Sequence, residues 1–518
     1  MPNLDGLPAE LFTAIFEQTP LCHRTATVLA LTRALPHSPV PFHHSLFSTI
    51  NLKHPEQVIQ LYRRIRQVDL PGKWIQNFSV EAWTADADVI INLVRFLPNL
   101  SSLTIFIGPH NFAPEHLEEL FSRPISGLRF ISLRFRPYVQ KASYYQFHKG
   151  AYFDSTLLAL SDWPDDNPLP VLSIVQDPLD AQVSHRQAFA QPLVFFSLEP
   201  LTTLVSSPYL RSLTSLRLRV PSRQLGRFIT ARPDSLPALQ LLDVSTCNIN
   251  SADVNTILTR FAGLRHLILD ECAVLRGELH ENDWRDLGKA CALAGARRVK
   301  EREKKLKAWL EKSWLEKADP RTEDGQMQLQ SDTPKIRKGR RGLATATISL
   351  REAPEKDSTP RINSQREPVP AERIRIIPPI PSLRSLCVTL PSSIAADRHS
   401  LIHEAFETGW IEGLLTLVAT RVRLRQSLLN GVVRVTRFVG SGNEGDGLVG
   451  LEDVQSEFDE EAFEIPPQHE VWRAPVLCLL GEDGPHVEGC GHSIGREIWV
   501  KDTSRETCDD CASILQPS

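Results

Sequence analysis

The sequence predicts an α/β fold in which strand–helix units stack beside one another, after a small all-helical module at residues 1–50. Short apolar segments recur along much of the chain at intervals of about 25 residues, which indicates a repeat architecture. Amphipathic helical segments lie between them. One such unit cannot bury its own apolar face, whereas stacked units share a core. We therefore expect one parallel sheet with helices along one side.

The first fifty residues are expected to form two short helices. Leu7, Leu11 and Ile15 recur every four residues, so one face of the first helix is a broad apolar stripe. The second helix is expected across residues 25–35, and Pro36 ends it. Two helices of this length cannot bury both apolar faces alone, so the module is expected to pack on another surface.

Three stretches of this module resemble a fungal F-box: Leu-Pro-x-Glu-Leu-x-x-x-Ile-Phe at 7–16, Leu-Ala-Leu-Thr-Arg-Ala-Leu at 29–35, and Pro-Phe-His-His-Ser-Leu-Phe-Ser-Thr-Ile-Asn-Leu at 41–52. The resemblance implies a helical module that docks on a Skp-type adaptor and so joins a cullin-based ubiquitin ligase. It also implies the adaptor contacts, which are Leu7, Pro8, Leu11, Ile15 and Phe16. The alternative is a helical hairpin that only caps the next domain.

Two segments, 239–249 and 264–274, match the leucine-rich-repeat pattern L-x-x-L-x-L-x-x-N/C-x-L. Residues 51–296 are therefore predicted to form a leucine-rich-repeat solenoid whose parallel sheet lines a concave side. Looser copies of the pattern begin near residues 75, 100, 128, 169, 213 and 383, and amphipathic helices are expected at 55–68, 85–97 and 251–261.

The residues between the repeat leucines are expected to face solvent along the concave sheet, because side chains alternate along a strand. An extended polar face of this kind favours a protein ligand over a small molecule. The alternative is a solvated face without a partner. The candidate substrate contacts are Arg134, Arg217, Arg219, Asp243, His266 and Asp270.

Two charged segments interrupt the C-terminal half. Residues 297–380 are expected to be a basic helix followed by a disordered insertion, and 381–440 a last repeat with a helix. Residues 441–470 contain ten acidic residues and no Lys or Arg, so they are expected to be an exposed loop. The basic run at 335–341 suits a nuclear import signal or an acidic partner, and a solvated linker is the alternative.

The tail, residues 471–518, holds a candidate metal site. Cys490, His492, Cys508 and Cys511 make a Cys3His set, the kind of donor set that holds structural zinc, with Cys478 and His486 as further candidates. Because protein would fill all four positions, no open site for catalysis is expected. Reduced cysteines without a metal are the alternative.

Composition and motifs argue against several other functions. The formal charge is 58 − 62 = −4, so neither nucleic acid nor membrane is expected as a partner. The nine cysteines are scattered, and the sequence has neither a signal-peptide pattern nor an apolar run of 18 residues. We therefore expect a cytoplasmic or nuclear protein. The G-x-S-x-G at 491–495 has no histidine after it, and acidic residues follow the G-x-G-x-x-G at 440–445, so no enzyme is expected.

These observations lead to one expected function and its rivals. The chain is expected to be a substrate-recognition subunit of an SCF-type E3 ubiquitin ligase, which binds a Skp-type adaptor and a protein substrate. The first rival is a leucine-rich-repeat scaffold outside any ligase. The second is a hydrolase or dinucleotide enzyme that uses the glycine motifs.

Overall fold

The structure, a computed structural model, describes residues 8–19, 21–35, 47–67, 70–108, 110–136, 152–178, 194–233, 235–272, 281–318, 373–390, 398–438, 451–454, 460–481, 484 and 486–499. Within this part of the chain, ten parallel strands form one sheet in the order of the sequence. The predicted α/β class with a parallel sheet is confirmed. The strands are β1 (Thr49–Leu52), β2 (Asn77–Val80), β3 (Ser102–Ile107), β4 (Phe130–Phe135), β5 (Val171–Gln176), β6 (Ser215–Arg219), β7 (Leu241–Asp243), β8 (His266–Ile268), β10 (Ser385–Cys387) and β13 (Val476–Cys478).

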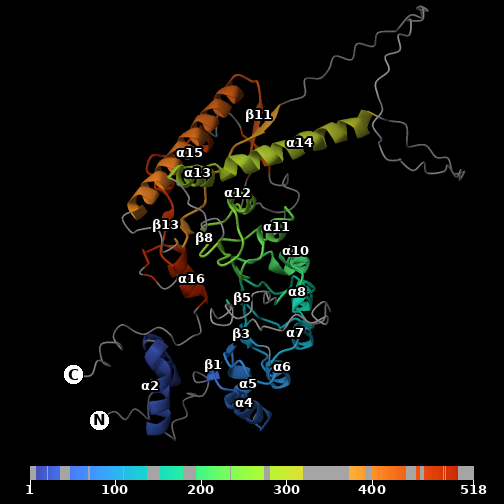
Figure 1. Ribbon diagram of the computed structural model, residues 1–518, viewed down its shortest axis with the longest axis vertical. Coiled ribbons are helices and arrows are strands. Elements are labelled where there is room, and N and C mark those ends of the chain that lie inside the picture. The colour runs from blue at the N-terminus through green and yellow to red at the C-terminus, as the bar shows by residue number, and fades with distance from the viewer. Residues whose placement is uncertain are drawn as a thin grey trace, which may run out of the picture.

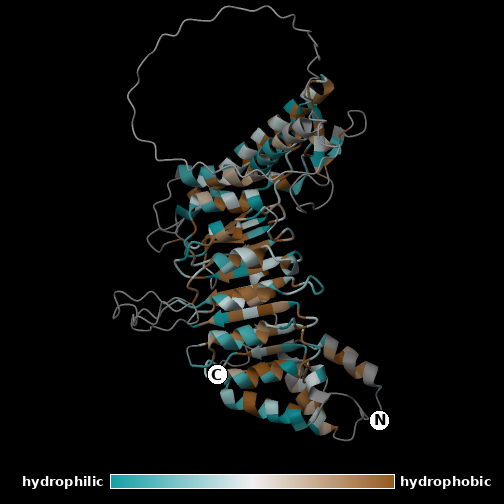
Figure 2. Cartoon of the chain, turned by 90° about the vertical axis from the view of Figure 1, so that its right-hand side faces the viewer, coloured by the Kyte–Doolittle hydropathy of each residue, from teal (hydrophilic) through white to brown (hydrophobic). Residues whose placement is uncertain are grey.

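The register of the sheet aligns the same apolar position of successive repeats. Leu216 pairs with Leu242 and Leu242 with Leu267. The ladder continues through Leu386 to Leu477. All five side chains are between 0% and 6% exposed and belong to one core that extends from Leu52 to Leu479. Figure 2 shows apolar strand residues in brown along the length of this stack.

Helices line one side of the strands, while the last helix, α16, lies on the other side (Figure 1). The helices predicted at 55–68, 85–97 and 251–261 are confirmed as α4, α6 and α12. The helices of this part of the chain are α4 (Pro55–Gln67), α5 (Leu70–Trp74), α6 (Ala87–Arg95), α7 (Pro114–Phe121), α8 (Asp154–Ser161), α10 (Glu199–Val205), η4 (Pro208–Leu210), α11 (Gly226–Ile229), α12 (Ser251–Arg260), α13 (Glu281–Ala292), α14 (Ala294–Ala318), α15 (Arg398–Leu429) and α16 (Gly491–Trp499).

Side chains that accept hydrogen bonds set the first turns of two of these helices. Asp86 accepts from the backbone N–H groups of Asp88 and Val89 at the start of α6. Asn250 and Asp253 cap α12 reciprocally, at 2.9 and 3.0 Å. These bonds satisfy backbone donors that have no partner inside the helix. Among the described residues, no helix has both the length and the apolar character needed to cross a lipid bilayer.

The structure departs from the expected layout at the C-terminal end. The region expected to be an exposed acidic loop, 441–470, contains strand β12 (Leu451–Asp453) and the short helix η6 (Glu460–Phe463), and a further short helix, η7 (Glu470–Trp472), begins at its last residue. Strand β12 pairs with β11 (Arg434–Phe438), which in turn pairs with β9 (Ile374–Ile376) in a second sheet. The acidic side chains of Glu452, Asp453 and Glu461 are exposed, whereas apolar Val454 and Phe463 are buried in a small core with Val435 of β11. The tail also adds β13, which was not predicted.

The N-terminal helices form a separate small core. Helix α1 (Ala9–Gln18) and helix α2 (Leu21–Ala34) bury Phe12, Phe16 and Val28 against one another. Leu11 and Ile15 lie on the other side of α1 and are 49% and 45% exposed. The apolar side chains of α1 are therefore divided between a face buried against α2, with Phe12 and Phe16, and a face open to solvent, with Leu11 and Ile15.

Helices α13 and α15 cross at glycines. A Cβ on Gly409 would overlap the carbonyl oxygen of Arg285, and a Cβ on Gly288 would overlap that of Phe406. Arg285 also forms an ion pair with Glu412. The two backbones can approach so closely only where no side chain intervenes.

We expect Gly409→Ala to lower the free energy of unfolding by about 1–3 kcal/mol, because the added methyl group forces the helices apart. A loss of stability would be informative, because replacing glycine by alanine inside a helix otherwise stabilises the helix by about 1 kcal/mol. Chemical denaturation measures the change. The control is Gly481→Ala, whose Cβ would make ordinary contacts with Thr389 at 3.5 Å. Unchanged stability of the Gly409 variant would contradict the close crossing.

Candidate functional site

The candidate substrate contacts on the middle of the sheet form an internal charge network instead of an open surface. Asp243 is fully buried and accepts from Arg219 Nη2 at 2.7 Å, and Arg217 Nε lies 3.2 Å from it. Burial acts to raise the pKa of Asp243, but the two arginines overcome it and hold the pKa below its usual range. The expectation that Asp243 faces solvent was therefore wrong.

Helix α16 lies across β8 and β10 on the face opposite the leucine ladder. The guanidinium of Arg217 lies 6.0 Å from the ring centroid of Trp499. His266 and Asp270 are only 9% and 6% exposed. They too were wrongly expected to face solvent. Of the six candidates, Arg134 is the exposed one; it pairs with Asp177 at 2.7 Å.

Four metal-ligating side chains meet beneath α16. The ligand atoms of Cys387, Cys478, Cys490 and His492 lie within 4.8 Å of one another, and all four residues are buried. This cluster could hold a metal ion. In a tetrahedral zinc site with Zn–S bonds of about 2.3 Å, neighbouring sulfur atoms are about 3.8 Å apart, so small shifts would bring these atoms into position.

The strands supply half of the cluster. Cys387 ends β10 and Cys478 ends β13, and the two residues are direct partners in the register of the sheet. Each cysteine lies between two core residues in the sequence. Cys387 lies between Leu386 and Val388, and Cys478 lies between Leu477 and Leu479. Because side chains alternate along a strand, each thiol points to the opposite face, beside Ile268.

The start of α16 supplies the other half. Gly489 has φ +78°, a conformation that favours glycine, and it turns the chain so that Cys490 precedes the helix. A Cβ on Gly491 would lie 3.1 Å from Cys387 Sγ and 3.1 Å from Ser385 Oγ. Glycine at 491 therefore lets the helix approach the strands closely enough for His492 to reach the thiols.

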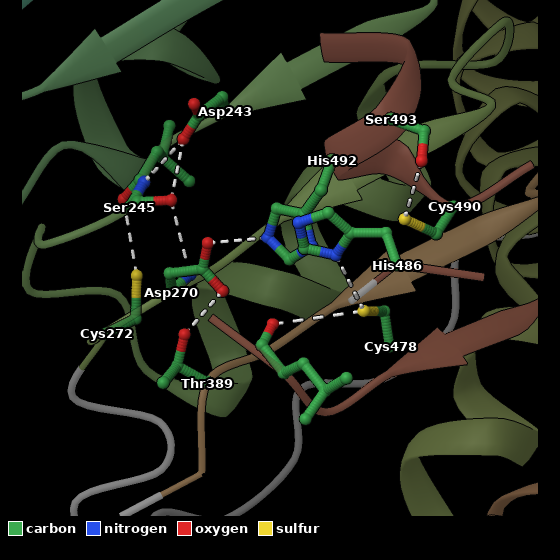
Figure 3. Close-up of polar contacts among 12 residues, drawn as sticks. Asp243, Ser245, Asp270, Cys272, Thr389, Cys478, His486, Cys490, His492 and Ser493 are labelled. Carbon is green, nitrogen blue, oxygen red and sulfur yellow. Dashed lines mark hydrogen bonds and ion pairs between the residues drawn. The ribbon is translucent and has the colours of Figure 1, made fainter. Parts of the chain in front are cut away.

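His492 is oriented by a buried carboxylate. Its Nε2 lies 2.7 Å from Asp270 Oδ2, and Asp270 Oδ1 accepts from the Thr389 hydroxyl at 2.8 Å (Figure 3). Its Nδ1 is buried and has no hydrogen-bond partner among the described residues. A histidine whose one nitrogen is held by a carboxylate and whose other nitrogen is open has the arrangement of metal-ligating histidines.

The thiols of the cluster influence one another's protonation. Interaction with Cys387 holds the pKa of Cys478 and the pKa of Cys490 below the usual range of a thiol. The pKa of Cys387 itself is raised by the same interactions. Burial acts to lower the pKa of His492, but Asp270 and Cys478 raise it to about 10. A cation would replace these protons.

The cluster contains only part of the metal set that the sequence predicted. Cys490 and His492 are members, while Cys508 and Cys511 lie outside the described residues. Cys478, a further candidate, is a member. His486 lies beside the cluster, with its Nδ1 3.8 Å from Cys478 Sγ and its ring 4.6 Å from that of His492. Sequence reasoning missed Cys387, although its place between the apolar repeat positions Leu386 and Val388 was a usable signal.

The residues implied as adaptor contacts fall into different environments. Pro8, Leu11 and Ile15 are exposed, and Leu7 lies outside the described residues. Leu11 and Ile15 line a shallow pocket of 470 Å³ with Ala14, Gln18 and Thr19. Phe16 is 5% exposed against α2, so its expected contact with an adaptor is wrong for this conformation. The i, i+4 spacing does not tell which side of a helix meets its neighbour.

Comparison with known proteins does not assign the chain to a family. A scan against protein-family models found no match, and a search of curated proteins found none either.

We expect Asp243→Asn to destabilise the protein by about 3–5 kcal/mol, because it leaves the charges of Arg217 and Arg219 without their buried partner. Thermal and chemical unfolding measure the loss. The matched control is Asp177→Asn, which removes the more exposed pair with Arg134 and should cost less than about 1 kcal/mol. Equal effects of the two substitutions would show that the Asp243 network is not buried in solution.

Proposed function

We propose that this protein is a substrate-recognition subunit of an SCF-type E3 ubiquitin ligase. In this proposal residues 1–50 are an F-box that binds a Skp-type adaptor, and residues 51–296 are a leucine-rich-repeat solenoid that binds a protein substrate. The chain itself performs no chemistry. It raises the rate of ubiquitin transfer by holding the substrate near a separate conjugating enzyme.

One observation carries the adaptor proposal: α1 keeps half of its apolar stripe open. Leu11 and Ile15 are 49% and 45% exposed, whereas Phe12 and Phe16 are buried against α2. A cap on the sheet would bury that stripe in the main core. A solvent-facing apolar helix surface is instead what a partner protein requires.

The sheet supports the substrate proposal at its N-terminal half. Arginine and aromatic side chains gather where β2, β3 and β4 end. Trp83 and Phe106 have ring centroids 4.8 Å apart, and the guanidinium of Arg134 lies 5.2 Å from the Phe106 ring. Arg136 lies over Trp83 at 5.4 Å. Trp and Arg dominate binding energy at protein interfaces, so we propose this group as the substrate contact in place of the residues that α16 covers.

We also propose that Cys387, Cys478, Cys490 and His492 hold a structural zinc ion. Three thiolates and one imidazole suit zinc, and four protein ligands leave no position for a reacting water. The ion would join two strands to the start of α16, and so fix the C-terminal segment on the sheet.

The adaptor proposal is tested by co-purification of the full chain with a Skp-type adaptor. We expect the Leu11→Glu, Ile15→Glu variant to lose the adaptor, because two carboxylates would be buried in an apolar interface. Both residues are exposed, so the melting temperature should not change. The control is Leu158→Glu, which places one such carboxylate on an exposed leucine of α8. An intact chain that binds no adaptor would favour the non-ligase scaffold.

The zinc proposal is tested by metal content after purification. We expect one zinc ion per chain, its loss in Cys387→Ser and Cys478→Ser, and its retention in a Cys508→Ser, Cys511→Ser double variant. The proposed set contains Cys387 and Cys478, whereas the set predicted from the sequence contains Cys508 and Cys511 in their place. The two kinds of variant therefore distinguish the two sets. Zinc that is kept by the strand variants but lost from the tail variant would overturn this assignment.

A further inference from the structure

A large cavity lies at the C-terminal end of the stack of strands. The cluster of Cys387, Cys478, Cys490 and His492 is not part of its lining. Its volume is 1020 Å³, at the upper end of the range for small-molecule sites. The walls come from α12, α14, α15, β11 and the 377–383 segment that leads into β10. Figure 1 shows α12, α14, α15 and β11 gathered at this end of the stack.

The lining of this cavity is positively charged, and one of its arginines, Arg211, lies 3.9 Å from a carboxylate outside the lining, that of Asp165. Six arginines contribute to it, and none of the described residues that line it is acidic. Arg211 and Arg265 are exposed, whereas Arg421 is 5% exposed. The six arginines are Arg211, Arg265, Arg298, Arg302, Arg421 and Arg437.

The innermost charges are held by neutral groups. Arg298 donates to the carbonyl oxygens of Leu258 and Thr259 at the end of α12, at 3.1 and 2.7 Å. Arg421 donates to the carbonyl oxygens of Pro378 and Glu464, at 3.0 and 3.4 Å. These bonds orient the guanidinium groups but do not cancel their charge.

The arginines also repel one another. Burial lowers the pKa of Arg298 to about 10, and the charges of Arg302 and Arg260 act in the same direction, against the opposing effect of Glu301. Burial and Arg260 lower the pKa of Arg302 as well. The fold therefore keeps several guanidinium groups close together at an electrostatic cost, which a bound anion would relieve.

We propose that this cavity is a binding site for a small polyanion that carries two or more phosphate groups. Guanidinium groups match phosphate oxygens with paired hydrogen bonds, and several of them balance more than one phosphate. The apolar part of the lining, which includes Phe261, Val299 and Leu383, would contact the uncharged part of the ligand. This site is independent of the proposed ligase function.

Isothermal titration of the full chain with inorganic pyrophosphate tests the site, with inorganic phosphate as the weaker comparator. We expect saturable binding that weakens as salt is added. The Arg265→Gln, Arg302→Gln variant should bind more weakly by about tenfold per arginine, because each substitution removes a charge-assisted contact. Neither residue is fully buried, and an unchanged melting temperature shows that the variant is folded.

The matched control is Arg63→Gln, Arg123→Gln, which removes the same charge from exposed positions outside the cavity. Vesicles of phosphatidylcholine with and without phosphatidylinositol bisphosphate separate the two sources of such a group. Co-sedimentation that depends on Arg265 and Arg302 identifies a lipid headgroup, and pyrophosphate binding without co-sedimentation identifies a free anion. The proposal is overturned if the intact chain shows no saturable binding, or if the cavity and control variants are weakened equally.

Discussion

The alternation of side chains along parallel strands that share one register is the constraint on which the rest of this structure depends. Leu216, Leu242, Leu267, Leu386 and Leu477 form a continuous ladder on the core side of the sheet. Once these leucines are buried, each neighbouring residue must point to the other face. The buried Asp243 and the thiols of Cys387 and Cys478 are consequences of that geometry, because each lies between two apolar residues that point into the core.

Helix α16 determines what this second face can do. It covers the C-terminal strands, where Asp270 orients His492 and where Arg217 lies near Trp499. Toward the other end, Arg134, Arg136, Trp83 and Phe106 are at least partly accessible. A receptor built on this sheet would therefore have two dissimilar halves, one sealed by the C-terminal segment and one open to a partner. The exposed stripe of α1 adds a second, separate contact surface.

The fold was more predictable than the candidate site because it rests on local periodicity. The repeats at 239–249 and 264–274 predicted strands β7 and β8, and Asn250 with Asp253 marks the start of α12. The site depends on pairing across long distances, since Cys387 and Cys478 are 478 − 387 = 91 residues apart and are joined only by the register. The burial of Asp243 could not be predicted either, because its partners Arg217 and Arg219 are brought to it by the pairing of β6 with β7. Phe16 is buried against the neighbouring helix α2, and the i, i+4 spacing did not tell which side of α1 would meet that helix.

The most direct test asks whether the cluster of Cys387, Cys478, Cys490 and His492 holds α16 on the sheet. It measures hydrogen exchange of the full chain after incubation with zinc, with and without a chelator. Removing the metal should increase exchange at 385–387, 476–478 and 491–499 together, because the proposed ion would join these three segments, while β3 to β5 keep their protection. Unchanged exchange in the two strands would contradict this account. It would mean that any bound metal is held elsewhere and that α16 stays in place without it.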